Sequence, residues 1–234
     1  MSVAGSGGSA GSPALGVPAD LLDLTNWKLT LPVGEPDSPT EILQPELASF
    51  VLDPYFRLDD DSSGVLFRAH AGGVTTSGSD YPRSELREMT NAGSDLAAWS
   101  MVSGTHTITI RQAILHLPVV KAHVVAGQIH DSEDDVVMIR LEGEHLFVEG
   151  GGSELGDLNT SYQLGTEFTV RITASAGMIQ IFYDDLSTPV VEVPSVAPSC
   201  YFKAGAYTQS NVDRGDEPGA YGEVVIYDLD VTHE

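Results

Sequence analysis

The chain has 234 residues, of which 34 are Asp or Glu and 11 are Lys or Arg, so its formal net charge is −23. A charge of this sign repels phosphates and argues against a nucleic-acid or membrane partner, and no apolar run reaches the ~18–20 residues that span a bilayer. With 41% hydrophobic residues, the chain has enough apolar material for a core.

The first twelve residues are rich in Gly and Ser and contain neither the basic nor the apolar stretch of a signal peptide. This composition is typical of a flexible linker or of an artificial extension. All-β domains of about 200–250 residues are common. We therefore predict a flexible segment over 1–20 and a single folded domain over 21–234.

From residue 22 onward, short runs of alternating apolar side chains, rich in β-branched residues, predict β-strands. They lie at 64–70, 105–112, 136–141, 167–173, 178–183 and 222–231. Turn signals at 142–144, 175–177 and 183–187 are typical of hairpins, and only 45–50 resembles a short helix. The pattern predicts an all-β domain of two packed antiparallel sheets, a sandwich of jelly-roll type.

Three further segments carry polar residues on one face at the spacing of a strand. In 81–88, alternation groups Arg83, Glu85 and Arg87 and turns Leu86 the other way. In 125–130, Gln128 and His130 share a face. The segment 201–209 aligns Tyr201, Lys203, Tyr207 and Gln209.

Side chains that alternate outward are expected on any half-solvated sheet, so one such segment by itself says little. Here, however, the cations are concentrated in a chain that holds only 11 of them. Arg83, Arg87, Lys203 and Arg140 fall on or beside the predicted strands. If the strands lie side by side, they form a cationic, concave groove that suits an anionic substrate.

These segments resemble the three signature motifs of the family 7 polysaccharide lyases, the alginate lyases. The motifs are Arg-Ser-Glu-Leu-Arg at 83–87, Gln-Ile-His at 128–130 and Tyr-Phe-Lys-Ala-Gly-Ala-Tyr-Thr-Gln at 201–209, in the order of the family. The resemblance covers residue 22 to the C-terminus. It implies a β-jelly roll with a substrate groove and a polysaccharide lyase that acts on alginate. No step of that reaction needs a metal or cofactor, and because a linker before a domain is common in secreted enzymes, we expect secretion.

The residue types suit β-elimination on a 4-linked uronate, where the C5 proton lies next to a carboxylate. Arg83 and the Gln128 amide can neutralise that carboxylate, with His130 as a third contact. The resemblance implies Tyr207 as the acid, and Tyr207 or His130 as the base, depending on the C5 epimer. We predict substrate-binding roles for Arg87, Lys203, Glu85, Tyr201 and Gln209, with Glu85 orienting Arg87. Arg87 can instead be a scaffold cation, and Lys203 can instead supply a positive charge beside Tyr207.

In the family, an Ile at the middle of the Gln-x-His motif accompanies activity on guluronate or mixed blocks. Ile129 therefore implies a preference for guluronate-containing stretches, and we expect endolytic action by a monomer. The loop 72–80 can act as a lid. The acidic run 133–135 is expected to be an exposed turn, and the other histidines lie in no ligand-like spacing.

Two alternative functions remain. A glycoside hydrolase on a similar sandwich needs paired carboxylates on one strand, and the nearest match, 35–41, contains Pro36 and Pro39, which disfavour a central strand. A carbohydrate-binding module needs an aromatic platform, but aromatics make up only 7% of the chain, and Trp27 and Trp99 lie outside the motifs.

Overall fold

The computed structural model describes residues 16–234, so residues 1–15 of the predicted flexible segment lie outside the described residues. Pro18–Asp20 form a short 3₁₀ helix, η1, with Pro18 buried. Folded structure therefore begins before residue 21, earlier than the sequence predicts. In the part of the chain that the structure describes, no helix is long and apolar enough to cross a membrane.

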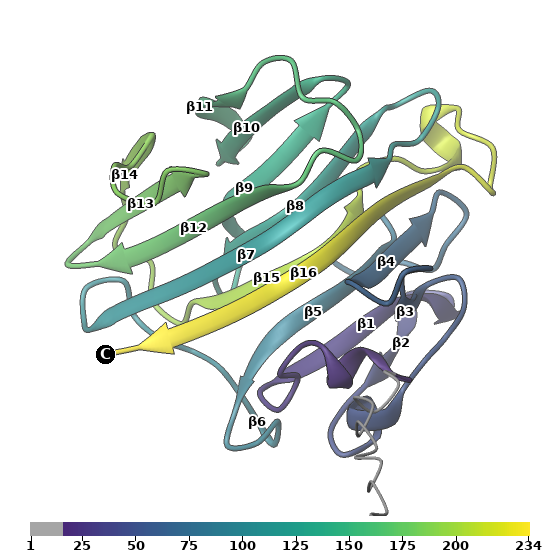
Figure 1. The fold of residues 1–234 in the computed structure, drawn as a ribbon, viewed down its shortest axis with the longest axis horizontal. Coiled ribbons are helices and arrows are strands. Elements are labelled where there is room, and N and C mark those ends of the chain that lie inside the picture. The colour runs from purple at the N-terminus through teal and green to yellow at the C-terminus, as the bar shows by residue number, and fades with distance from the viewer. Residues whose placement is uncertain (1–15) are drawn as a thin grey trace, which may run out of the picture.

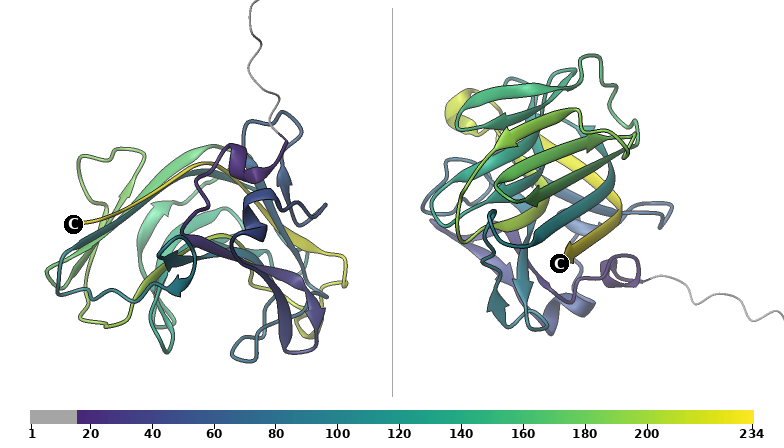
Figure 2. Two further views of the ribbon diagram at one scale, coloured as in Figure 1. Left: turned by 90° about the horizontal axis from the view of Figure 1, so that it is seen from below. Right: turned by 90° about the vertical axis from the view of Figure 1, so that its left-hand side faces the viewer.

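The predicted sandwich is confirmed: two antiparallel sheets lie one over the other and bend in the same sense (Figures 1 and 2). The first, here called the groove sheet, has the order β11 (Ser153–Asn159), β10 (His145–Gly150), β9 (Asp135–Glu142), β8 (His123–His130), β15 (Tyr201–Thr208), β5 (Arg83–Thr90), β1 (Trp27–Glu35) and β2 (Ser38–Ile42), with β6 (Asp95–Leu96) paired to β5. The second, the outer sheet, has the order β14 (Val191–Pro194), β13 (Met178–Tyr183), β12 (Phe168–Ser175), β7 (Thr105–His116), β16 (Tyr221–His233), β4 (Val65–His70) and β3 (Phe56–Leu58).

Each of the six strands predicted from alternation is present, and β7 continues to His116, past the predicted end at 112. The predicted helix at 45–50 is a single 3₁₀ turn, η2 (Glu46–Ser49), and a third, η3 (Val212–Arg214), follows β15. In β12, every second residue is buried, which is the pattern of a strand with one face on the core and one toward solvent.

The core lies between the sheets and contains Phe67, Ile110, Ile129, Phe202 and Val224, each with no exposed surface. Ile129 and Phe202 therefore point away from the concave face, as alternation predicts. The central strands β5, β8 and β15 are buried on both faces, because long polar side chains cover the side opposite the core.

The topology places the three motif strands next to one another in the middle of the groove sheet, in the order β8, β15, β5. They are far apart in the sequence, and β15 lies between the other two. The site described next depends on this arrangement.

Candidate active site

The register of the three strands brings the motif residues into rows across the groove sheet. Lys203 on β15 lies opposite Arg87 on β5 and Gln128 on β8. Tyr207 lies opposite Arg83. Tyr201 lies opposite His130.

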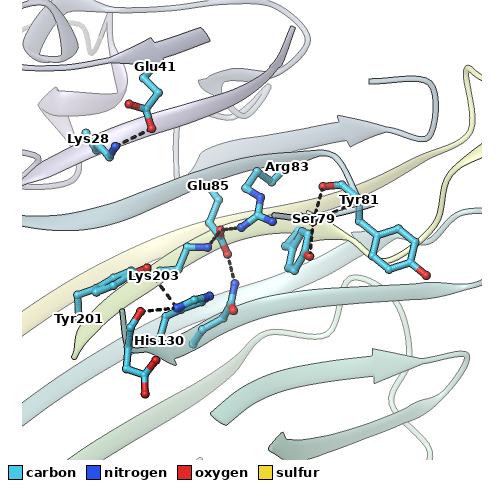
Figure 3. Close-up of polar contacts among 12 residues, drawn as sticks. Lys28, Glu41, Ser79, Tyr81, Arg83, Glu85, His130, Tyr201 and Lys203 are labelled. Carbon is cyan, nitrogen blue, oxygen red and sulfur yellow. Dashed lines mark hydrogen bonds and ion pairs between the residues drawn. The ribbon is translucent and has the colours of Figure 1, made fainter. Parts of the chain in front are cut away.

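Together these rows form the floor of a groove of about 290 Å³. Figure 3 shows its polar side chains, with Lys28 and Glu41 on one side of the motif residues. The groove is lined by Lys28, Thr30, Glu41, Thr76, Gly78, Ser79, Arg83, Arg87, Gln128, His130, Glu133, Asp134, Asp135, Tyr201, Lys203 and Tyr207. Four of the 11 basic residues of the chain are in this set, beside four acidic residues.

Glu85 lies at the centre of the floor and is 1% exposed. Its carboxylate is 2.6 Å from Lys203 Nζ and 3.3 Å from Arg83 Nη1, and it accepts a hydrogen bond from Gln128 Nε2 (Figure 3). Burial alone raises the pKa of Glu85, but Lys203 and Arg83, with the bonds from Lys203 and Gln128, lower it below its ordinary value. Glu85 therefore holds three groove side chains in place as an anion.

The prediction that Glu85 orients Arg87 is wrong. Arg87 donates to the backbone oxygen of Glu88 at 2.9 Å, and its guanidinium lies 3.8 Å from the centre of the Tyr201 ring. Alternation places Glu85 and Arg87 on one face but does not say which cation lies nearest, and the neighbouring strand supplies Lys203 instead. Glu85 is also too buried to line the groove, so it acts on the substrate through its partners.

Lys203 has its pKa lowered to about 8, first because burial disfavours the charged form and second because Arg83 repels it, with Glu85 opposing both. It is 7% exposed and lines the groove. At neutral pH the ammonium is still charged, so the floor holds two cations, Arg83 and Lys203, around a single carboxylate. This excess of positive charge attracts an anionic ligand.

His130 is held as one tautomer by its neighbours. Its Nδ1 lies 2.7 Å from the backbone oxygen of Asp131, which can only accept a hydrogen bond, so Nδ1 carries the proton. The Tyr201 hydroxyl lies 3.2 Å from the same nitrogen. Burial, as the largest cause, lowers the pKa of His130. A neutral imidazole with a free Nε2 lone pair can therefore accept a proton from a ligand in the groove.

Tyr207 is clamped from two sides. The Arg83 guanidinium lies 3.9 Å from the centre of its ring, and the ring of Tyr81 meets it edge-on with centroids 6.4 Å apart. The hydroxyl of Tyr207 lies 2.7 Å from Ser79 Oγ. Tyr207, whose hydroxyl can donate a proton, and His130, whose Nε2 can accept one, thus line one groove with a cationic floor.

Comparison with known proteins identifies this arrangement. The family model described as alginate lyase matches residues 22–233. The chain belongs to the alginate lyase family. It is 59% identical to the polysaccharide lyase family 7 alginate lyase AlgAT5, with a TM-score of 0.90 over 93% of this chain and 99% of the other. It is 45% identical to the alginate lyase from Corynebacterium sp., with a TM-score of 0.90 over 94% and 99% of the two chains.

A doubly substituted form of the family 7 alginate lyase A1-II′, solved in complex with the substrate GGMG, is 27% identical, with a TM-score of 0.80 over 94% of this chain and 97% of the other. The protein is therefore an alginate lyase, a polysaccharide lyase of the jelly-roll type that binds a polysaccharide. The hydrolase alternative has no structural basis at 35–41, where β1 ends at Glu35 and β2 is the edge strand of the sheet.

Besides Glu85, one residue of the predicted alginate lyase site, Gln209, does not line the groove, and Arg140, the cation noted beside the predicted strands, does not line it either. Gln209 is 5% exposed, follows the end of β15 at Thr208, and does not line the groove, because the alternation of a strand does not extend past its last residue. Arg140 on β9 is paired with Glu142 at 2.7 Å and with Glu149 at 2.5 Å, so its charge is neutralised away from the floor.

Sequence reasoning missed other groove residues. Lys28 on β1 forms an ion pair with Glu41 on β2 at 2.6 Å, which no sequence motif indicates. The acidic run forms the predicted exposed turn at Glu133 and Asp134, before β9 begins at Asp135, and all three residues also line the groove. The pKa of Asp135 is raised to about 6, first by burial and then by its neighbour Asp134. The protonated form of Asp135 is therefore favoured at this place in the groove lining.

The sequence shows no ligand-like spacing around His145, yet the pairing of β10 and β11 brings it beside Glu154 and Asp157, with the three ligand atoms within 4.8 Å of one another. His145 Nε2 lies 2.5 Å from Asp157 Oδ1, within hydrogen-bond distance. None of the three lines the groove.

Proposed function

We propose that this alginate lyase cleaves its polymer endolytically by β-elimination, with a preference for guluronate-containing blocks. The observation that supports this most directly is that His130, with its Nε2 lone pair free, and Tyr207 line the same groove, whose floor is cationic. The groove crosses β2, β1, β5, β15 and β8, and an open groove across a sheet suits an internal stretch of a chain.

In the proposed reaction, Arg83 and the second amide hydrogen of Gln128 neutralise the uronate carboxylate. The charge that develops as the C5 proton leaves can then spread onto that carboxylate. Gln128 has one amide hydrogen committed to Glu85, which fixes the direction of the other. His130 Nε2 takes the C5 proton of guluronate, and Tyr207 protonates the departing O4.

The two epimers present the C5 proton on opposite faces relative to O4. For mannuronate, base and acid must act from one side, and Tyr207 then performs both steps. Ile129, behind Gln128 and His130, is fully buried between the sheets. Its packing sets the tilt of both neighbours, and a methylene at this position is worth about 1 kcal/mol.

We also propose that the enzyme is secreted and acts as a monomer, without nucleic acid or membrane as a partner. A polymeric substrate must be cut before it can enter a cell. The net charge of −23 opposes binding to phosphate polymers. The cations Arg83, Arg87 and Lys203, which are concentrated on the groove floor, support local binding of an anionic polysaccharide.

The test is to follow the ultraviolet absorbance of unsaturated uronyl ends on poly-guluronate and poly-mannuronate, together with viscosity. We expect a higher initial rate on poly-guluronate and an early fall in viscosity. Tyr207→Phe should lower kcat by about 10²–10⁴-fold while binding of oligosaccharide is retained. A clearly higher initial rate on poly-mannuronate contradicts the preference for guluronate. Release of monomer at constant viscosity contradicts endolytic action.

A further inference from the structure

The hydroxyl of Tyr207 has one hydrogen-bond partner among residues 16–234, and that partner is outside all three motifs. Ser79 Oγ lies 2.7 Å from Tyr207 Oη, and either atom can be the donor (Figure 3). Ser79 lies in the loop between β4 and β5 and lines the groove. A residue at this distance from the proposed acid acts directly on its proton.

Ser79 is itself fixed by backbone contacts. Its N–H donates to the oxygen of Thr76 at 3.0 Å. Its Oγ accepts the N–H of Tyr81 at 3.1 Å. The hydroxyl proton of Ser79 has two acceptors within reach, the backbone oxygen of Tyr81 at 3.3 Å and Tyr207 Oη at 2.7 Å.

These contacts allow two states with the same heavy-atom positions. When Tyr207 is protonated, its O–H donates to Ser79 Oγ and the Ser79 proton points to the oxygen of Tyr81. When Tyr207 has lost its proton, the Ser79 O–H rotates and donates to the phenolate, while Oγ still accepts from Tyr81 N–H. No proton is gained or lost by Ser79 in either state.

We propose that Ser79 is a positioning residue that holds the Tyr207 oxygen in both protonation states through this rotation of its hydroxyl. The proposal rests on the proposed role of Tyr207. It implies that Ser79 matters most where Tyr207 must begin the reaction as a phenolate, which is the mannuronate case. On guluronate, Tyr207 begins protonated, and the contribution of Ser79 is smaller.

The charged and titratable groups around Tyr207 come from several elements. The Arg83 guanidinium on β5 lies 3.9 Å from the centre of the Tyr207 ring. Lys203 is on β15, the strand that carries Tyr207, and its Nζ lies 5.8 Å from the same ring centre. Tyr81 packs edge-on against the ring and in turn contacts Lys121 and Arg214. Because these groups stay in place when Ser79 is changed, they contribute equally to the variants compared below.

The experiment measures kcat and KM on both block polymers from pH 6 to 10 for Ser79→Ala and Ser79→Thr. Ser77→Ala is the matched control, because Ser77 is exposed in the same loop and does not line the groove. On poly-mannuronate at pH 7, we expect Ser79→Ala to lower kcat by about 10- to 100-fold, since hydrogen bonds to charged groups are worth this much. KM should change less than about twofold, because Ser79 is proposed to act on the proton of Tyr207 and not on substrate binding.

A hydrogen bond donated to a phenolate favours it, so its loss should move the rising limb of the poly-mannuronate profile to higher pH. On poly-guluronate, Ser79→Ala should lower kcat by a smaller factor. Ser79→Thr, which keeps the hydroxyl, should retain the activity that Ser79→Ala loses. Ser77→Ala should be as active as the parent enzyme on both polymers. In a Tyr207→Phe background, Ser79→Ala should have no further effect.

Equal losses on both polymers with an unshifted pH profile would overturn the proposal, as would a failure of Ser79→Thr to restore activity in a protein that melts normally. An active Tyr207→Phe enzyme overturns the role of Tyr207 itself. If Tyr207→Phe is inactive but Ser79→Ala behaves like Ser77→Ala, only the inference about Ser79 fails.

Discussion

Glu85 places a negative charge in the middle of a site that has to bind a polyanion. Its value lies in the contacts it makes, because it fixes Lys203, Arg83 and Gln128 at once while the two cations together outweigh its charge. A buried carboxylate that three donors satisfy is stable only as long as all of them remain in place.

We expect Glu85→Gln to destabilise the protein by about 3 kcal/mol, because it leaves Lys203 and Arg83 buried without a counter-charge. The free energy of unfolding in urea measures this. Glu167→Gln, which removes the exposed partner of Arg111, is the matched control and should cost less than about 1 kcal/mol. If the Glu85→Gln protein is as stable as the control, the charges of Lys203 and Arg83 do not depend on Glu85 for their stabilisation.

Asp135 is expected to weaken substrate binding in a pH-dependent way. Its pKa of about 6 lies above the ordinary 3.8, so the protonated carboxyl stabilises the folded state. This contribution to stability is complete below about pH 4 and is lost as the pH rises through 6. Above pH 6 the anion faces the groove. Asp135→Asn should therefore lower KM for alginate several-fold at pH 8 and little at pH 5.

The control for this change is Asp61→Asn, which removes the same charge from an exposed position between β3 and β4. Both variants are compared by initial rates at pH 5 and pH 8. An equal effect of the two substitutions at pH 8 would mean that net charge matters and the position of Asp135 does not.

At the scale of the elements, the floor depends on an irregularity in β15. Its register against β8 shifts between Ala204 and Tyr207, and Gly205 between them has a φ of +136°. A Cβ on Gly205 would come within 2.6 Å of the oxygen of Ser84 and 2.9 Å of Glu85 Cα. Only glycine allows β5 and β15 to approach this closely beside Glu85.

Gly205→Ala should therefore cost about 1–3 kcal/mol of stability and lower kcat, since the shift of β5 needed to admit the methyl group moves Arg83 and Glu85. Thermal unfolding and initial rates measure the two effects. Gly219→Ala is the matched control, because a Cβ there meets no atom within 4 Å. If Gly205→Ala is destabilised but fully active, the close approach of β5 and β15 at Gly205 is not needed for catalysis.

At the scale of the whole molecule, a chain of charge −23 must meet a polyanion. The groove lining holds four basic and four acidic residues, so attraction is confined to the floor formed by Arg83, Arg87 and Lys203. Long-range repulsion and short-range attraction respond differently to salt, because the Debye length falls from about 30 Å at 0.01 M to about 10 Å at 0.1 M.

We expect kcat/KM on alginate to rise with salt at first and then to fall. The rise follows from the screening of the overall charge, and the fall from weakened contacts in the groove. Initial rates between about 0.01 and 1 M NaCl, with KCl as a check on ion-specific effects, test this. A steady decline from the lowest salt would show that the cationic floor dominates the field that the substrate meets.

The sequence by itself determined the features that depend on local alternation. The predicted strands, the all-β class and the inward turn of Ile129 and Leu86 follow from the period of two along each strand. Alternation also placed Arg83, Gln128, His130 and Tyr207 on polar faces, because the face a side chain occupies depends only on its own strand.

Only the tertiary structure decided which faces meet. The order β8, β15, β5 and the register between them make Lys203, and not Arg87, the partner of Glu85. The loop before β5 and the flanking strands β1 and β9 bring Ser79, Lys28 and Asp135 into the groove, whereas the end of β15 leaves Gln209 out. These are contacts between segments far apart in the chain, and the pairing and packing of whole sheets determine them.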